Sequence, residues 1–439
     1  MDTVNAISSG DTAFVLLSAA MVFIMTPAVA LFYGGMVRGK NVLSTIMQSM
    51  FILGMVSVEF ILIGYTMAFG PDLNGFIGDL SKFGLASVGY NILEGATIPE
   101  LAFIIFQCMF AALTPALITG AIAERMKFSG FAILMLLWAI FIYNPMAHWV
   151  WGGGFLAQLG ALDFAGGLVI HILSGVSGLT ICILLGKRRG YGKRAMVPHN
   201  IPMSVIGAAF LWLGWMFFDA GSALGANELA ANAFVVTHIA AASGLLGWVI
   251  LEWIRSGKPT VLGAISGCVA GMVAITPASG YVTIIPSMFI GLIGGGICYG
   301  AVAILKERLG YDDSLDAFGI HGVGGIWGAL ATGLWATTSI NPAGANGLFY
   351  GETDLFIAQI ISIGVAIILA VVGSTVLYKI VNAFVTIRAD ETEEINGLDI
   401  SEHGERGYTE TIFTGVPNFI AEDFSSTSSV FNLNSHSTN

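Results

Sequence analysis

The chain has 439 residues, of which 56% are hydrophobic and only 10% are charged. An average soluble domain has about 25% charged residues, so this composition excludes an ordinary soluble globule. The apolar residues fill nearly every stretch between Ala13 and Val385, which indicates a polytopic membrane protein rather than a soluble body with one anchor. The net charge is -11, and no nucleic-acid partner is expected.

The apolar stretches divide into eleven expected transmembrane helices, because a bilayer core about 30 Å thick needs roughly 20 apolar residues per helix. The expected spans are residues 12–37, 42–69, 101–122, 129–147, 163–186, 201–221, 228–254, 261–278, 283–305, 317–337 and 355–387. The predicted fold class is therefore an all-α, multi-pass protein of the cell membrane, in contact with membrane lipid.

The positions of lysine and arginine predict the orientation of these helices, because basic residues stay cytoplasmic in short loops. With an outside N-terminus and a cytosolic C-terminus, 16 of the 17 basic residues fall in cytosolic segments, and only Lys82 falls outside. The largest group is the loop from Lys187 to Arg194.

The acidity is concentrated in the C-terminal segment, where residues 388–439 carry ten acids and two bases. We therefore expect a transmembrane domain over residues 1–387 and an acidic cytosolic tail over 388–439, ordered to about residue 408 and flexible over 409–439. The four cysteines have no metal-ligand spacing, so neither a metal site nor a cofactor is expected.

Two histidines occur in matching settings at membrane depth. His171 follows Asp163 by eight residues in the fifth span, and His321 follows Asp313 by eight residues in the tenth. Because each span is the fifth of a set of five and five is odd, the second set must have inverted topology, which is a common plan of transporters. The pattern predicts a 5+5 inverted repeat, followed by one long final helix, in which the two imidazoles approach each other.

A single buried histidine is more often a structural residue than a functional one, but the paired occurrence reverses those odds. Burial disfavours the charged form, so two adjacent imidazoles are expected to be neutral and able to accept and donate protons. They suit a proton relay or the binding of a small polar molecule, whereas metal binding lacks a third ligand. Asp163 and Asp313 are expected to cap their helices, and Asp163 could also bias the entrance toward cations.

Several aromatic residues are ambiguous from spacing alone. Trp151, in the outer loop expected after the fourth span, could equally be an interfacial anchor. Phe110 and Phe218 would by themselves be interpreted as core or lipid-facing residues, and nothing in their spacing makes them a gate.

A series of motifs in fixed order changes this interpretation. The motifs are Gly34-Gly-Met-Val-Arg-Gly-Lys-Asn41, Ala121-Ile-Ala-Glu-Arg125, Ala147-His-Trp-Val-Trp-Gly-Gly-Gly154, Gly160-Ala-Leu-Asp-Phe-Ala-Gly-Gly167, Phe318-Gly-Ile-His-Gly-Val-Gly-Gly325 and Gly397-Leu-Asp-Ile-Ser-Glu-His-Gly404. Together they closely resemble the ammonium transporter family over about residues 10–408. Trp151 makes the chain similar to the Amt branch rather than to Rhesus-type channels.

The resemblance implies a homotrimer with one pore per subunit that takes up ammonium and is not an enzyme. Trp151, Phe110 and Ser222 match the outer ammonium site, with Gln107 and Trp215 beside it. Phe110 and Phe218 match the stacked gate, and His171 and His321 match the paired pore histidines. Ammonium would lose its proton at the entrance, and ammonia and the proton would cross separately, which avoids carrying a full charge through an apolar pore.

The tail motif from Gly397 to Gly404 resembles an ordered segment that couples the subunits, and a PII-class nitrogen signalling protein often docks on this face in the family. An alternative function is an ammonium sensor that acts through a cytosolic partner. Two acidic residues depart from expectation: Asp219 stands beside Phe218 where the family commonly has asparagine, and Glu59 lies inside the second span without a physical explanation.

Overall fold

The computed structural model describes residues 7–408, and the expectation for 409–439 lies outside the described residues. The α-helices are α1 (Ser9–Met36), α2 (Val42–Glu59), α3 (Tyr65–Phe69), α4 (Glu100–Ile122), α5 (Phe128–Trp138), α6 (Asn144–Trp151), α7 (Phe155–Gln158), α8 (Leu173–Leu185), α9 (Ile201–Gly221), α10 (Glu228–Ser256), α11 (Val261–Ile275), α12 (Ile284–Gly300), α13 (Lys306–Leu309), α14 (Val323–Trp335), α15 (Asp354–Phe384), α16 (Glu391–Asn396) and α17 (Leu398–His403).

Several of these helices are continued by π-helical turns, in which the backbone hydrogen bond spans five residues instead of four. These turns are η2 (Phe60–Gly64), η4 (Ala139–Tyr143), η5 (Gly167–Ile172), η6 (Ala301–Leu305) and η7 (Phe318–Gly322). Short 3-10 turns are η1 (Gly39–Asn41), η3 (Phe83–Leu85) and η8 (Leu348–Tyr350). The remaining element is an antiparallel hairpin of β1 (Asp72–Leu73) and β2 (Ile77–Gly78).

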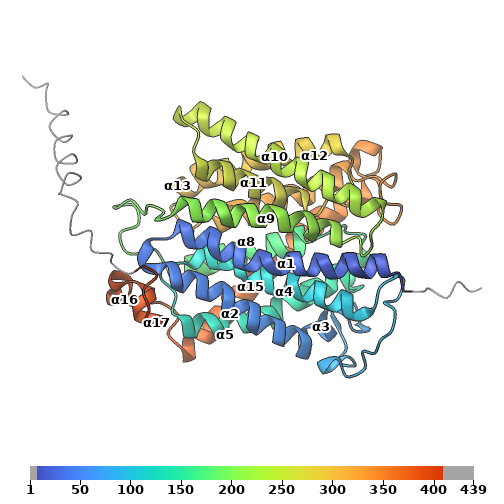
Figure 1. The fold of residues 1–439 in the computed structure, drawn as a ribbon, viewed down its shortest axis with the longest axis horizontal. Coiled ribbons are helices and arrows are strands. Elements are labelled where there is room, and N and C mark those ends of the chain that lie inside the picture. The colour runs from blue at the N-terminus through green and yellow to red at the C-terminus, as the bar shows by residue number, and fades with distance from the viewer. Residues whose placement is uncertain (1–6, 409–439) are drawn as a thin grey trace, which may run out of the picture.

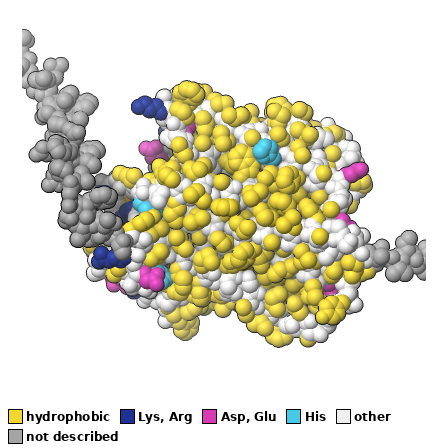
Figure 2. All heavy atoms as spheres, viewed as in Figure 1, with side chains coloured by type: hydrophobic (Ala, Val, Ile, Leu, Met, Phe, Trp, Pro, Cys, Tyr) yellow, Lys and Arg dark blue, Asp and Glu magenta, His cyan; other side chains and the backbone are white. Residues whose placement is uncertain are grey.

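The long helices run side by side and form one bundle (Figure 1). Figure 2 shows that hydrophobic side chains predominate on the face over α1, α9 and α10, with one histidine among them and the charged side chains gathered toward the two ends of the helices. Among the described residues, nine helices are long and apolar enough to cross a membrane. This is the arrangement expected when lipid surrounds the middle of a bundle and water meets its ends.

Each of the eleven expected spans coincides with a helix, and the all-α multi-pass fold class is confirmed. Two spans differ from their expected bounds. The eighth, expected over 261–278, is helical only over Val261–Ile275. The fourth continues past residue 147 because Pro145 stands in the first turn of α6, where it removes no hydrogen bond, so Trp151 ends a helix instead of lying in a loop.

The two ends of the bundle separate the loops as the topology requires. At one end, the loops that follow α1, α4 and α8 contact one another through Arg38–Glu124 and Arg188–Glu124 ion pairs. At the other end, the hairpin is tied to α6 by a hydrogen bond of 2.9 Å between His148 and Asp72. By the distribution of basic residues, the first end is cytosolic.

The inverted repeat is visible in the local backbone. The fourth and ninth spans each contain a π-helical turn, η4 and η6, and the fifth and tenth each begin with one, η5 and η7. These two pairs of corresponding spans therefore share an irregularity, whereas η2 in the second span has no counterpart in α10, the seventh span.

Candidate functional site

The two histidines meet at the centre of the bundle. His171 lies in η5 and His321 in η7, and their Nδ1 atoms are 3.3 Å apart. Both side chains are buried. Their rings are nearly parallel, at 19°. The sequence pattern therefore predicted a pair that the structure brings into contact.

The contact between the two Nδ1 atoms restricts their protonation. A hydrogen bond between them needs a proton on one Nδ1 and a lone pair on the other. When both rings are neutral, one Nε2 is then an acceptor and the other Nε2 carries the proton. The Nε2 of His171 is buried without a protein partner. The pair can thus accept a proton at one end and release one at the other.

Two glycines allow the histidines to come this close. Gly175 follows His171 by four residues, and a Cβ added to it would clash with the backbone of Gly322. Gly325 follows His321 by four residues and lies against the other segment, where an added Cβ would be 3.0 Å from the His171 Cβ. The pattern His-x-x-x-Gly occurs four times in the sequence, at His148, His171, His321 and His403, so it could not by itself have identified these two glycines.

Aromatic rings lie on the outer side of the two histidines. Trp215 stacks on His171 with ring centroids 5.2 Å apart, and its Nε1 donates to Thr276 Oγ1 at 2.8 Å. Phe110 from α4 and Phe218 from α9 stack at 4.1 Å and 7°. At this separation the two phenyl rings are in van der Waals contact.

The outer side of this stack is formed by Trp151, whose ring lies 6.2 Å from that of Phe110 at 80°. Its Nε1 donates a 2.7 Å hydrogen bond to the carbonyl of Asp163. Ser222 follows the last residue of α9, and its hydroxyl donates to the carbonyl of Phe218 at 3.0 Å. Gln107, one turn before Phe110, has a side-chain carbonyl buried without a partner. This arrangement offers a small cation an aromatic face and oxygen acceptors.

The two aspartates hold backbone amides. Asp163 accepts from the N–H groups of residues 166, 167, 168 and 169, at 2.6–3.2 Å. Asp313 accepts from Ala317 at 3.1 Å and Phe318 at 2.8 Å. Each carboxylate therefore satisfies amides at the start of a segment that carries a pore histidine.

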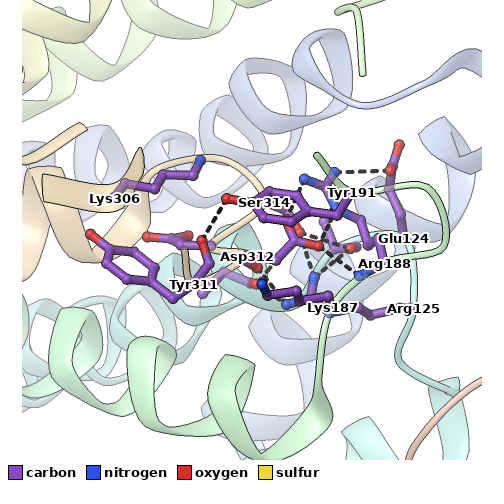
Figure 3. Close-up of polar contacts among 12 residues, drawn as sticks. Glu124, Arg125, Lys187, Arg188, Tyr191, Lys306, Tyr311, Asp312 and Ser314 are labelled. Carbon is purple, nitrogen blue, oxygen red and sulfur yellow. Dashed lines mark hydrogen bonds and ion pairs between the residues drawn. The ribbon is translucent and has the colours of Figure 1, made fainter. Parts of the chain in front are cut away.

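A cytosolic polar cluster, made of Glu124, Arg125, Arg188, Asp312 and Ser314, lies next to the start of the His321 segment (Figure 3). Arg188 pairs with Asp312 at 2.7 Å and with Glu124 at 3.0 Å. Arg125 donates to the Asp312 carbonyl at 2.6 Å and to Ser314 at 2.5 Å. Because Asp312 precedes Asp313, the cluster fixes the segment that leads into η7.

The cluster is ionised at neutral pH. Burial by itself raises the pKa of Asp312 and of Glu124, but hydrogen bonds and charge from Arg188 and Arg38 outweigh it and hold each pKa below its ordinary value. A carboxyl group whose pKa is lower in the folded than in the unfolded protein stabilises the fold at pH values above its unfolded pKa. This stabilisation is lost as the pH falls through the folded pKa.

The described part of the tail caps other helices. Asp399 in α17 accepts from the N–H of Ser44 at 2.8 Å, in the first turn of α2. Glu402 accepts from the N–H of Phe128 at 2.9 Å, the first residue of α5. Sequence reasoning did not predict these contacts, because they join residues more than 250 positions apart.

Among residues 7–408, no group of three or more His, Cys, Asp or Glu side chains is placed to hold a metal ion. Lys82, the one basic residue on the outer side, pairs with Glu100 at 2.6 Å.

Comparison with known proteins gives one consistent result. The Ammonium Transporter Family matches residues 13–408. The ammonium transporter of Bacillus subtilis is 51% identical over 404 residues, which cover 92% of this chain and 99% of that protein. The crystal structure of Saccharomyces cerevisiae Mep2 superposes with a TM-score of 0.84 at 35% identity and covers 94% of each chain. A solved sensor Amt protein also has a TM-score of 0.84, at 28% identity, with 90% of this chain and 98% of that one covered.

Proposed function

Because the chain belongs to the Ammonium Transporter Family, we propose that it carries ammonium across the cell membrane as ammonia plus a proton. The stacked pair Phe110 and Phe218, set above the paired His171 and His321, is the observation that supports this mechanism. Trp151, Ser222 and Gln107 bind the cation at the entrance. The phenyl rings then exclude the charged ion and its water, since a desolvated charge is costly in an apolar pore.

The histidine pair supplies the polar path below the gate. Ammonia that passes the phenyl rings donates to or accepts from an imidazole Nε2, while the shared Nδ1 proton lets the pair relay charge. Trp215 holds the His171 ring in place by stacking. Reconstitution in liposomes tests this function: an ammonium-evoked current supports transport, whereas ammonium binding without current would favour the sensor function.

The entrance site gives a first prediction. Replacing Trp151 by leucine should weaken the apparent ammonium affinity by up to about 30-fold, because cation–π attraction contributes roughly 0.5–2 kcal/mol. Trp149→Leu is the matched control, since Trp149 lies on the same short helix but donates to Phe76 in the hairpin loop. The half-saturating ammonium concentration of the current measures the effect, and equal values for both variants would make Trp151 only an interfacial anchor.

We also propose that residues 1–387 are the transport domain and that the acidic segment 388–439 is its cytosolic tail. The caps from Asp399 and Glu402 on α2 and α5 support a coupling role for residues 397–408. We propose a PII-class signalling protein as a partner for this cytosolic face, and co-purification of the two proteins tests the proposal.

Two truncations give a second prediction. A chain that ends after Tyr408 should keep nearly normal ammonium current. A chain that ends before Gly397 loses both carboxylate caps, each worth about 1 kcal/mol, and its current should fall strongly. The two chains are compared at equal membrane abundance, and equal currents would rule out the coupling role.

The assembly is proposed to be a homotrimer. His238 is exposed on α10 among membrane-facing residues, with its ring 5.4 Å from that of Trp212, whose Nε1 is buried without a partner. An exposed histidine in contact with lipid is costly, so a neighbouring subunit over this face would stabilise it. Native mass spectrometry of the purified protein measures the subunit number.

A further inference from the structure

Glu59, the last residue of α2, is a carboxyl group inside a membrane span that the transport pathway does not use. Its side chain is buried, with only 5% of the residue exposed. Its Oε1 accepts a 2.8 Å hydrogen bond from Asn144 Nδ2. Its Oε2 has no partner, and neither does the Oδ1 of Asn144. A carboxyl oxygen without a hydrogen-bond partner inside a membrane is costly in free energy. We therefore expect this group to bind a ligand or to have another function.

The backbone is irregular on both sides of this pair. The π-helical turn η2 begins directly after Glu59, and η4 ends directly before Asn144. Gly64 lies against the amide, since an added Cβ would be 3.1 Å from both Asn144 side-chain polar atoms. π-Helical turns are rare and are frequent at functional sites, so two of them facing one acid–amide pair indicate a built site.

A cavity of about 670 Å³ opens beside Glu59 between α2 and the helix formed by α5 and η4. Its wall is otherwise apolar and includes Met55, Leu136 and Ile140. Val58 and Leu62 at its mouth are 60% and 49% exposed, so the cavity opens outward from the bundle, toward lipid. None of the pore residues described above lines it.

The lining defines the chemistry of an occupant. A molecule that binds here must enter from the membrane and have an apolar part that fits the wall. It must also carry one group that forms a hydrogen bond with Glu59 Oε2. A primary amine is the base complementary to this acid: it takes up the carboxyl proton, and its N–H then donates to Oε2 in a charge-assisted hydrogen bond, which is about twice as strong as a neutral one. An alcohol can form only the neutral bond.

We propose that the cavity beside Glu59 binds a membrane-dissolved primary amine with an apolar tail, and that the Glu59 side chain turns toward the cavity so that Oε2, which is buried without a partner in the structure, forms a hydrogen bond with the amine nitrogen. The proton moves from Oε2 to the amine nitrogen, so the pair stays neutral overall and needs no other reactant. This site is independent of the pore, and the inference does not rest on the transport mechanism.

The test is the binding of radiolabelled dodecylamine to the full-length protein in detergent. Glu59→Gln keeps the shape of the side chain and an acceptor for Asn144 but removes the acid, and it should weaken binding about ten-fold or more. Glu228→Gln is the matched control, because it makes the same change at an exposed carboxyl group outside the cavity, and it should leave the affinity unchanged. Dodecanol should compete at least about ten-fold more weakly than dodecylamine in the wild type.

A second variant leaves the acid in place. Leu62→Trp fills the mouth of the cavity and should block dodecylamine while the ammonium current persists. Equal dodecylamine affinity in the wild type and in Glu59→Gln would overturn the proposal. Binding only to dissociated subunits would also overturn it, because a second copy of the chain would then cover the cavity.

Discussion

Replacing both His171 and His321 by leucine is expected to abolish the ammonium-evoked current. Leucine is close to histidine in size, so the pore keeps its packing but loses every polar atom of the pair. A desolvated charge left without a partner costs several kcal/mol. Since each 1.4 kcal/mol is a factor of ten, the current should fall at least about 100-fold.

The matched control for this experiment is His238→Leu, which removes an exposed histidine on α10, away from the pore. Its current should stay near that of the wild type as long as native mass spectrometry gives the same subunit number, because His238 lies on the face proposed to contact a neighbouring subunit. Both variants are compared as folded protein in proteoliposomes at equal abundance. An unchanged current in the double variant would show that the histidines are not the relay.

Gly175→Ala is expected to impair transport almost as severely, although it adds a single methyl group. That methyl group has no room, because the backbone of Gly322 already occupies its position. The helices must separate, and the 3.3 Å contact between His171 and His321 must lengthen. A misplacement of about 1 Å in a catalytic geometry can cost roughly 100-fold, and we expect a loss of this order in the maximal current.

Gly364→Ala is the control for this substitution, because Gly364 lies in α15 and an added Cβ there meets nothing within 4 Å. Ammonium affinity at the entrance should be unaltered in both variants, since neither glycine contacts Trp151. A Gly175→Ala protein with normal current would mean that the close approach of the two segments is not needed.

The sequence predicted the membrane fold because hydropathy and charge act over whole segments. The positions of 16 of the 17 basic residues were sufficient to predict which loops face the cytosol. The repeated Asp-to-His spacing identified His171 and His321 as the central pair. Trp151 was wrongly placed in a loop, because the predicted fourth span ended at residue 147, whereas α6 continues to Trp151.

Features that depend on distant contacts could not be predicted. The caps from Asp399 and Glu402 join the tail to α2 and α5, and no local pattern encodes such a pairing. The π-helical turns were not predicted either, because spans that are apolar on nearly every face have no hydrophobic pattern in which one added residue could be seen. Glu59 was noticed as a departure, but its partner Asn144 lies 85 residues away in the sequence.

The central claim is that the nitrogen crosses as ammonia and its proton crosses separately along the histidine pair. The most direct test is the ammonium-evoked current of the wild-type protein in proteoliposomes, measured in H₂O and in D₂O. Proton transfer through the pair predicts a clear current that is slowed in D₂O by more than the difference in solvent viscosity accounts for. A current of the same size in both solvents would contradict the account, because the intact ion would then cross without losing its proton.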